Sequence, residues 1–183
     1  MLFRSASFEE LDEELSTFDE NYNFRQLGIL KVSGESFVHT GEDTPPNHAH
    51  ETGEGYLVMG NALSEDTVPA MDEAYQENEH EELAERLMLT LEAGRDAGGQ
   101  IWQGEPIPEL YSLIKVYDGE KPYPAVDFRI DFALNAVETL RRMLDNLRDH
   151  SDRYYEAFYE TPEQVDENTL DWLWEVENNQ IIE

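Results

Sequence analysis

The order of predicted elements in this sequence indicates an α+β fold whose strands are antiparallel. Several segments place apolar residues at helical spacing, and two pairs of apolar runs flank short turn signals typical of hairpins. The predicted order is helix, two strands, strand, two helices, two strands, helix. This order lacks the regular strand–helix alternation of a doubly wound parallel sheet, so antiparallel strands with helices are favoured.

The first predicted elements are a helix over residues 7–18 and a hairpin within residues 24–41. Ser7 and Glu10 have the spacing of a capping box, in which each side chain bonds the other residue's backbone N–H. The hairpin turns at Ser33-Gly34, where glycine supplies the positive φ of a tight turn.

Residues 41–55 are predicted to form a loop, because Pro45-Pro46 cannot continue a strand ladder. The segment "YLVMGNAL", residues 56–63, then predicts a core strand buried on both faces or nearly so. Gly60-Asn61 would turn the chain at the end of this strand.

Two helices are predicted next, over residues 64–76 and 79–99. Asp66 or Thr67 would cap the first, with Pro69 in its first turn, where a missing N–H costs little. The second would end at Gly98-Gly99. Its predicted apolar stripe consists of Leu83, Leu87, Leu91 and Gly94.

The rest of the chain predicts a loop over residues 100–110, a hairpin over 111–131 around Asp118-Gly119, and a helix over 135–150. We predict that residues 1–150 form one domain. Residues 151–183 would form an aromatic and acidic helical tail, whose last helix opens at Thr161.

The charge of the chain restricts its partners. The 183 residues include 42 Asp and Glu against 12 Lys and Arg, a formal net charge of −30. Such a surface repels nucleic acid and anionic lipid, so we predict neither as a partner. The acidity is explained by adaptation to salt (a halophilic source), by DNA mimicry, or by an ordinary acidic surface, and the sequence leaves these open.

Several classes of site are excluded or disfavoured by composition. The chain has no Cys, which excludes disulfides, zinc–thiolate sites and a cysteine nucleophile within it. It has no apolar run long enough to span a membrane and no signal-peptide pattern at its start. We therefore predict a cytoplasmic protein that needs no cofactor.

Three groups of residues are open to a functional and a structural interpretation. His48 and His50, with Glu51 and His39 nearby, fit either a metal site or a solvated loop; the loop is favoured, and no metal is predicted. Asp127 and Asp131 fit either a catalytic acid pair or the exposed face of a strand, where Arg129 can neutralise both. Trp172 and Trp174 fit either ligand stacking or burial of the last helix, and burial is favoured.

The order of the motifs resembles one uncharacterised protein family. The motifs are "FRQLGILKVSGESFVHTG", "GYLVMGNAL", "LAERLMLTLEAGRDAGGQ", "YPAVDFRID" and "AVETLRRMLDNL". Over roughly residues 5–150 they resemble domain-of-unknown-function family ten-twenty-eight, whose members look like Ntn hydrolases. The resemblance implies an αββα sandwich of antiparallel sheets between helices, incomplete in this chain.

Six residues match the family pattern: His50, Gly60, Asn61, Gly98, Gly99 and Asp127. No catalytic role is known to us for any of them. We take His50, Gly60, Asn61 and Asp127 as candidate cleft residues, with His50 in the loop that leads into the strand.

The chain also departs from the family pattern. Family members carry a further strand-rich N-terminal region, and the Ntn class uses an N-terminal Thr, Ser or Cys whose own amine is the base. Met1-Leu2 offers no such residue. Family members also tend to have a Cys and a Trp shortly before the position of His50, where this chain has "EDTPPNHAH". They tend to have Arg-Ser where Glu109-Leu110 falls here.

These departures lead to two functional expectations. The first is an Ntn-hydrolase-like protein or fragment, related to amide-bond hydrolases and inactive as an isolated chain. It would form a homo-oligomer or pair with a chain that supplies the missing N-terminal part. The second is a non-catalytic acidic interaction protein, either a DNA mimic or a partner subunit. The tail would be a packing helix or the start of a peptidoglycan-binding-like domain.

Overall fold

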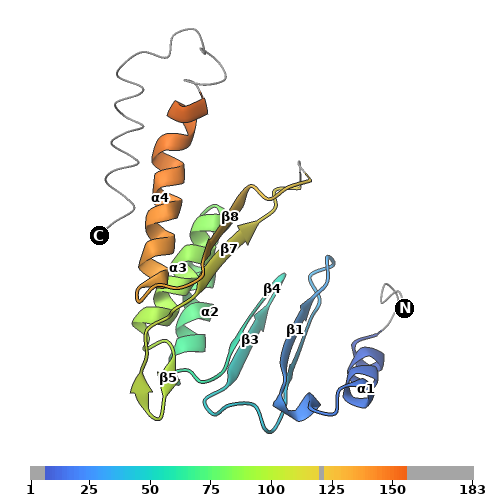
Figure 1. Ribbon diagram of the computed structural model, residues 1–183. Helices are drawn as coiled ribbons and strands as arrows, with labels where there is room; N and C mark the ends of the chain where they lie inside the picture. Colours follow the sequence, from blue (N-terminus) through green and yellow to red (C-terminus); the bar gives the residue numbers. More distant parts are fainter. Residues whose placement is uncertain (1–6, 120–121, 156–183) are drawn as a thin grey trace. The chain divides into compact units, whose positions relative to one another are not determined.

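The structure is a computed structural model that describes residues 7–119 and 122–155 (Figure 1). The chain divides after Leu140 into two compact units, and helix α4 runs from the first into the second. The helices are α1 (Phe8–Phe18), the 3₁₀ turn η2 (Tyr22–Phe24), α2 (Thr67–Glu77), α3 (Leu83–Asp96) and α4 (Ala136–Tyr155). The strands are β1 (Gln26–Leu30), β2 (Ser36–Thr40), β3 (Ala49–Gly53), β4 (Tyr56–Gly60), β5 (Ile101–Trp102), β6 (Glu105–Pro106), β7 (Ser112–Val116) and β8 (Val126–Ile130).

All the ladders among the described residues are antiparallel and two-stranded, which confirms the mixed α+β class. Strand β1 pairs with β2 from Gln26 opposite Thr40, and β3 pairs with β4 from Ala49 opposite Gly60. Strands β7 and β8 pair in the same manner, and β5 with β6 forms a small fourth ladder. The hairpins predicted at Ser33-Gly34 and Asp118-Gly119 are confirmed as pairs of strands.

Helix α1 covers one face of the β1–β2 hairpin. The predicted capping box is present: Glu10 N donates to Ser7 Oγ at 3.1 Å, and Ser7 N donates to Glu10 Oε2 at 2.9 Å. The Phe8 ring stacks on Phe37 of β2, with ring centroids 5.5 Å apart. This contact fixes the apolar stripe of the helix on the strand face that carries Phe37.

The opposite face of β1–β2 lies against the β3–β4 hairpin. A Cβ on Gly28 would lie 2.8 Å from Leu57 Cδ1 and 3.0 Å from Met59 Sδ, so a larger residue there would displace these two side chains. On the far side of β4, Tyr56 Oη donates to Asp72 of α2 at 2.7 Å. The local layers therefore run α1, β1–β2, β3–β4, then α2 with α3 (Figure 1).

Two segments predicted as loops contain strands. Residues 49–53 form β3, because the restriction imposed by Pro45-Pro46 ends before Ala49 and the following backbone is free to pair with β4. Residues 101–106 form the short β5–β6 hairpin, which turns through Gln103 and Gly104, both with positive φ. Pro106 is tolerated there because it lies at the end of a strand that is only two residues long.

The predicted helices exist, but their ends differ. Asp66 occupies the N-cap position of α2 without a side-chain bond, and the Thr67 hydroxyl donates instead to the Gly99 carbonyl at 3.3 Å. Neither residue is therefore the predicted side-chain cap. Helix α3 stops before Gly98-Gly99 as predicted, and both glycines have positive φ. Helix α4 continues to Tyr155, five residues beyond the predicted end at 150.

The buried core does not follow the predicted stripes throughout. Met88, Leu140 and Val68 are the largest fully buried side chains. On α3 the buried residues are Met88, Thr90 and Gly94, whereas Leu83, the start of the predicted stripe, is 45% exposed. In β4 Val58 is buried and the other four residues are half-buried, which is close to the predicted strand buried on both faces or nearly so.

No helix among residues 7–119 and 122–155 is long and apolar enough to cross a membrane. The predicted last helix from Thr161, with Trp172 and Trp174, lies outside the described residues.

Candidate functional site

The Gln26 side chain joins the two hairpins through a network of hydrogen bonds. Its Nε2 donates to the carbonyl oxygens of Ala49 (3.2 Å) and Gly60 (3.1 Å) and lies 3.3 Å from Thr40 Oγ1. Its Oε1 accepts from Asn61 Nδ2 at 3.0 Å. These five residues come from β1, β2, β3 and the end of β4, and we call them the Gln26 cluster.

Two of the four candidate residues from the sequence belong to this cluster. Asn61 contributes its side-chain amide and Gly60 its carbonyl. A Cβ on Gly60 would collide with the Leu63 side chain, which folds back over the strand end. A larger residue at this position would therefore displace the Leu63 side chain.

His50 lies one residue from the cluster, on β3 opposite Met59. Its side chain is exposed. It stands on a strand, and the expectation that it lies in a loop before the strand is wrong.

Asp127 is not part of the cluster. It lies on β8, and its carboxylate forms an ion pair with Lys115 Nζ of β7 at 2.8 Å. This partner raises the pKa of Lys115 through a hydrogen bond and charge attraction. Among the described residues Arg129 pairs with Asp131, while Asp127 pairs with Lys115, so the expectation that Arg129 neutralises both aspartates is wrong.

The histidines near the predicted metal motif have separate roles. His48 Nδ1 lies 3.1 Å from the Pro45 carbonyl, and His39 Nε2 lies 3.2 Å from the Tyr22 carbonyl. Among the described residues, no group of three or more His, Cys, Asp or Glu side chains could hold a metal ion.

A second polar cluster holds α1 and the following turn against β2. Tyr22 Oη donates to Asp12 of α1 at 2.5 Å, and the Tyr22 ring stacks on His39 at 3.9 Å between centroids. Burial, and then the hydrogen bond to the Asp12 carboxylate, raise the pKa of Tyr22 well above its usual value. These contacts link segments that are distant in the sequence. We interpret them as structural, because the hydroxyl of the buried tyrosine is already hydrogen-bonded to Asp12.

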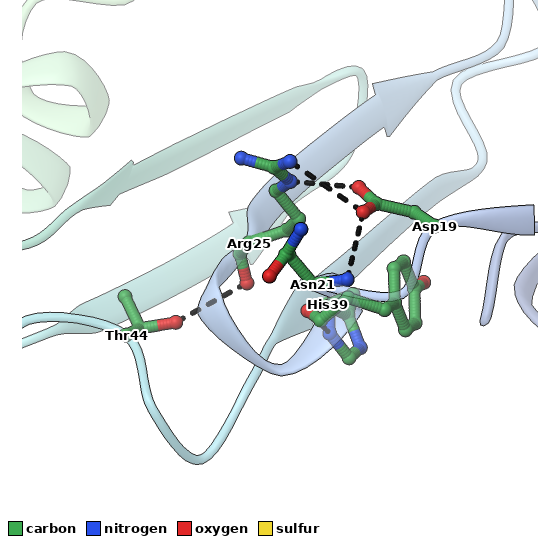
Figure 2. Close-up of polar contacts among 6 residues, drawn as sticks. Asp19, Asn21, Arg25, His39 and Thr44 are labelled. Carbon is green, nitrogen blue, oxygen red and sulfur yellow. Dashed lines mark hydrogen bonds and ion pairs between the residues drawn. The ribbon is translucent and has the colours of Figure 1, made fainter.

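The neighbouring turn is closed by further polar contacts, shown in Figure 2. Arg25 Nε donates to Asp19 Oδ2 at 2.7 Å, and Asn21 N donates to Asp19 Oδ1 at 2.9 Å. Thr44 Oγ1 donates to the Arg25 carbonyl at 3.2 Å. The chain is thereby fixed directly before Gln26, which orients the first strand for the Gln26 cluster.

An apolar cavity of about 560 Å³ lies on the other side of β4. It is lined by β4 and β7 and by apolar side chains of α2 and α3, including Met71, Leu87 and Leu91. Three leucines of the predicted α3 stripe, at positions 83, 87 and 91, line this space. The helical spacing correctly identified an apolar face, but that face borders a cavity in place of a filled core.

Sequence reasoning missed Gln26 entirely. The atoms it binds belong to residues 14 to 35 positions away in the sequence, so no local spacing connects them. The one available signal was a polar amide at the start of the otherwise apolar run "QLGIL".

The chemistry of the Gln26 cluster is hydrogen bonding. Its groups are two side-chain amides, a hydroxyl and backbone carbonyls, none of which titrates near neutral pH. Asn61 uses one Nδ2 hydrogen in its bond to Gln26, and no bond of its Oδ1 or of its second hydrogen is found among the described residues. This pair of groups complements an amide, which likewise offers one donor and one acceptor.

Comparison with known proteins identifies the family. Residues 1–140 match the protein family described as a family of unknown function, DUF1028, and the chain belongs to this family. The fold is similar to the crystal structure of protein SPO2555 from Silicibacter pomeroyi, also a DUF1028 protein, with a TM-score of 0.66 and 21% sequence identity. The similarity covers 81% of this chain and 64% of that one. No curated protein matches this sequence.

Proposed function

We propose that this DUF1028 protein is part of an amide-bond hydrolase built on an Ntn-type αββα sandwich. In this proposal the Gln26 cluster positions the substrate amide, and His50 lies next to the cluster on β3. The groups that cleave the bond are supplied by polypeptide beyond the described residues. The chain spans 64% of the length of the DUF1028 structure it matches, which leaves room for such a segment.

The observation that carries the proposal is the order of layers. Helix α1 packs on β1–β2 through Phe8 and Phe37, and β1 packs on β4 at Gly28. Strand β4 in turn contacts α2 through Tyr56 and Asp72. This order of helix, hairpin, hairpin and helices supports the proposal of an αββα sandwich.

The Gln26 cluster supports binding and not bond cleavage. Asn61 offers a donor and an acceptor at the end of β4, held in place by its bond to Gln26. Amide and hydroxyl groups without a positioned nucleophile leave only modest acceleration, because hydrogen bonds alone stabilise the transition state without forming the covalent intermediate. The chain by itself should therefore bind amides without turning them over.

Nuclear magnetic resonance tests this proposal directly. The side-chain amide signals of Asn61 and Gln26 would be followed while a panel of acyl-amide and glutamyl-amide compounds is added, and hydrolysis of the same compounds would be measured. We expect these signals to shift on binding and no turnover above background. Asn61→Ala should abolish the shift of the Gln26 side-chain signal on addition of the amide. Asn21→Ala, which changes an exposed asparagine outside the cluster, should leave that shift unchanged.

Two results would contradict the proposal. One is the absence of any shift at Asn61 or Gln26 across the whole panel. The other is turnover by the unmodified chain that disappears in His50→Ala, because the described residues would then carry the chemical step themselves.

A further inference from the structure

The apolar cavity runs along the edges of two strands. Five consecutive residues, from Gly55 to Met59, line it along β4, and three consecutive residues, from Leu113 to Lys115, line it along β7. Successive residues of a strand point to opposite faces, so a cavity on one face would touch alternate residues only. A cavity that touches every residue lies beside the strand edge, where the backbone N–H and C=O groups point.

Both of these edges lack a ladder partner. Within the described residues, β4 is paired only with β3, and β7 is paired only with β8. An edge strand presents a row of free donors and acceptors, which favours pairing with a further strand. Isolated two-stranded ladders are also marginal in stability, so an added strand would be favoured energetically.

We propose that the cavity between β4 and β7 is the docking site for an apolar β-strand donated by a partner polypeptide. The donated strand would pair with the free edges and join the two hairpins through its backbone. The inference is independent of hydrolysis, since it depends only on strand edges and apolar lining.

The lining defines the chemistry of the donated strand. Met71, Leu87 and Leu91 of the helices form one wall, and Leu30, Leu57 and Met59 line the cavity from the side of β1 and β4. A strand placed between these walls has apolar surface on both of its faces. Strands buried on both faces are near-continuous apolar runs, so the partner segment should be rich in Val, Ile and Leu.

The tail of this chain does not fit that description. Residues 156–183 contain nine Asp and Glu and no Lys or Arg, and no stretch of six consecutive residues among them is free of acids. Burial of a carboxylate in an apolar cavity without a partner is strongly unfavourable.

A second copy of the chain is disfavoured by its charge. Two chains with a formal net charge of −30 each repel one another, which opposes their association. A neutral partner avoids this repulsion, and a basic partner gains electrostatic attraction.

Hydrogen exchange with a designed peptide tests the inference. The probe is the peptide Ac-Lys-Thr-Val-Ile-Val-Ala-Val-Thr-Lys-amide, and its control replaces Ile and Ala by proline at the same charge. Proline removes backbone donors and cannot join a central ladder. Measurements in about 0.5 M NaCl suppress binding that depends on charge alone.

We expect the strand peptide, and not the proline control, to slow amide exchange in Tyr56–Gly60 and Ser112–Val116 by about tenfold or more. Leu113→Asp should weaken binding of the peptide by about tenfold, because it places a charge at the cavity. Leu134→Asp is the matched control. Both leucines are exposed, at 55% and 73%, so neither change should unfold the chain, and only Leu113 lines the cavity.

Three outcomes would overturn the inference. The first is protection of both edges in the chain before any peptide is added, since the edges would already be covered by this chain's own tail or by a second copy. The second is no added protection with the strand peptide, or equal protection with the proline control. The third is binding of a small apolar dye in the cavity while the peptide leaves edge exchange unchanged, which would assign the cavity to a small ligand.

Discussion

The two sides of strand β4 are built differently. Toward β1 the packing is close at Gly28, and the polar groups at the strand end are bonded to Gln26. Toward α3 and β7 the same strand borders an apolar cavity of about 560 Å³. One strand therefore borders both a closed, hydrogen-bonded region and an open, apolar one, and its Leu57 and Met59 take part in both.

This difference distinguishes a closely packed region of the molecule from one that leaves apolar surface and strand edges uncovered. Close packing and satisfied polar groups are typical of a finished interior. An apolar cavity beside unpaired strand edges is typical of a surface that binds something else. The two proposals concern different regions, since amide binding is proposed at Asn61 and strand binding at the cavity.

The largest expected effect is a difference in stability between variants of two neighbouring residues of α3. Met88 is fully buried, so Met88→Ala should lower the free energy of unfolding by about 3 kcal/mol. Leu87 lines the cavity, so Leu87→Ala removes fewer contacts and should cost less than about 1 kcal/mol. Urea unfolding of both variants measures the difference. Equal losses would mean that the cavity is already filled.

The second largest effect on stability is expected at Gln26, on the side of β4 that faces β1. Gln26→Ala removes bonds to the carbonyls of Ala49 and Gly60 and should cost about 2 kcal/mol, because part-buried acceptors lose their donor. Gln76→Ala removes one exposed bond to Asp72 and should change stability by less than about 0.5 kcal/mol. Thermal unfolding of the pair checks the prediction, which fails if the two variants melt together.

Salt should stabilise the whole molecule through its charge. With a formal net charge of −30, self-repulsion is large when screening is weak. The melting temperature should rise by several degrees as the Debye length falls from about 10 Å at about 0.1 M to about 3 Å at about 1 M salt. A flat response to KCl would remove the interpretation of the chain as salt-adapted.

Tyr22 and Tyr56 should make different contributions to the loss of stability at alkaline pH. Burial, and then a carboxylate partner, raise the pKa of Tyr22 and of Tyr56 above the usual value. The folded state therefore keeps these phenols protonated, while the unfolded state releases the protons from about pH 10 upward. The contribution of these two phenols to the free energy of unfolding is complete below about pH 10. It is lost as the pH rises toward their folded-state pKa values.

Removing each phenol tests this assignment. Tyr22→Phe should flatten the loss of stability above about pH 10 more than Tyr56→Phe does, because Tyr22 is buried and Tyr56 is only half-buried. Urea unfolding at a series of pH values measures the slopes. Equal slopes in the two variants would contradict the difference.

The smallest effect should come from Asp127. Its ion pair with Lys115 is exposed on both sides, and such pairs contribute little to stability. Asp127→Asn should therefore leave both the melting temperature and any amide binding at Asn61 unchanged. A loss of amide binding in this variant would return Asp127 to the candidate site.

Local patterns in the sequence identified most of the helices and hairpins, because the starts, turns and ends of these elements depend on neighbouring residues. The capping box of Ser7 and Glu10, the hairpin at Ser33-Gly34 and the stop at Gly98-Gly99 are each set by a few adjacent side chains. The same patterns failed at β3, since pairing with β4 overrides the loop character suggested by the two prolines.

The tertiary structure alone decided which residues meet and which apolar faces are filled. Gln26 reaches Gly60 and Asn61 only after the two hairpins pack, and no local spacing encodes that contact. The leucines of α3 show the complementary case. Helical spacing marks their face as apolar, but whether an apolar face is buried depends on what lies across from it, and here β4 and β7 leave that space open.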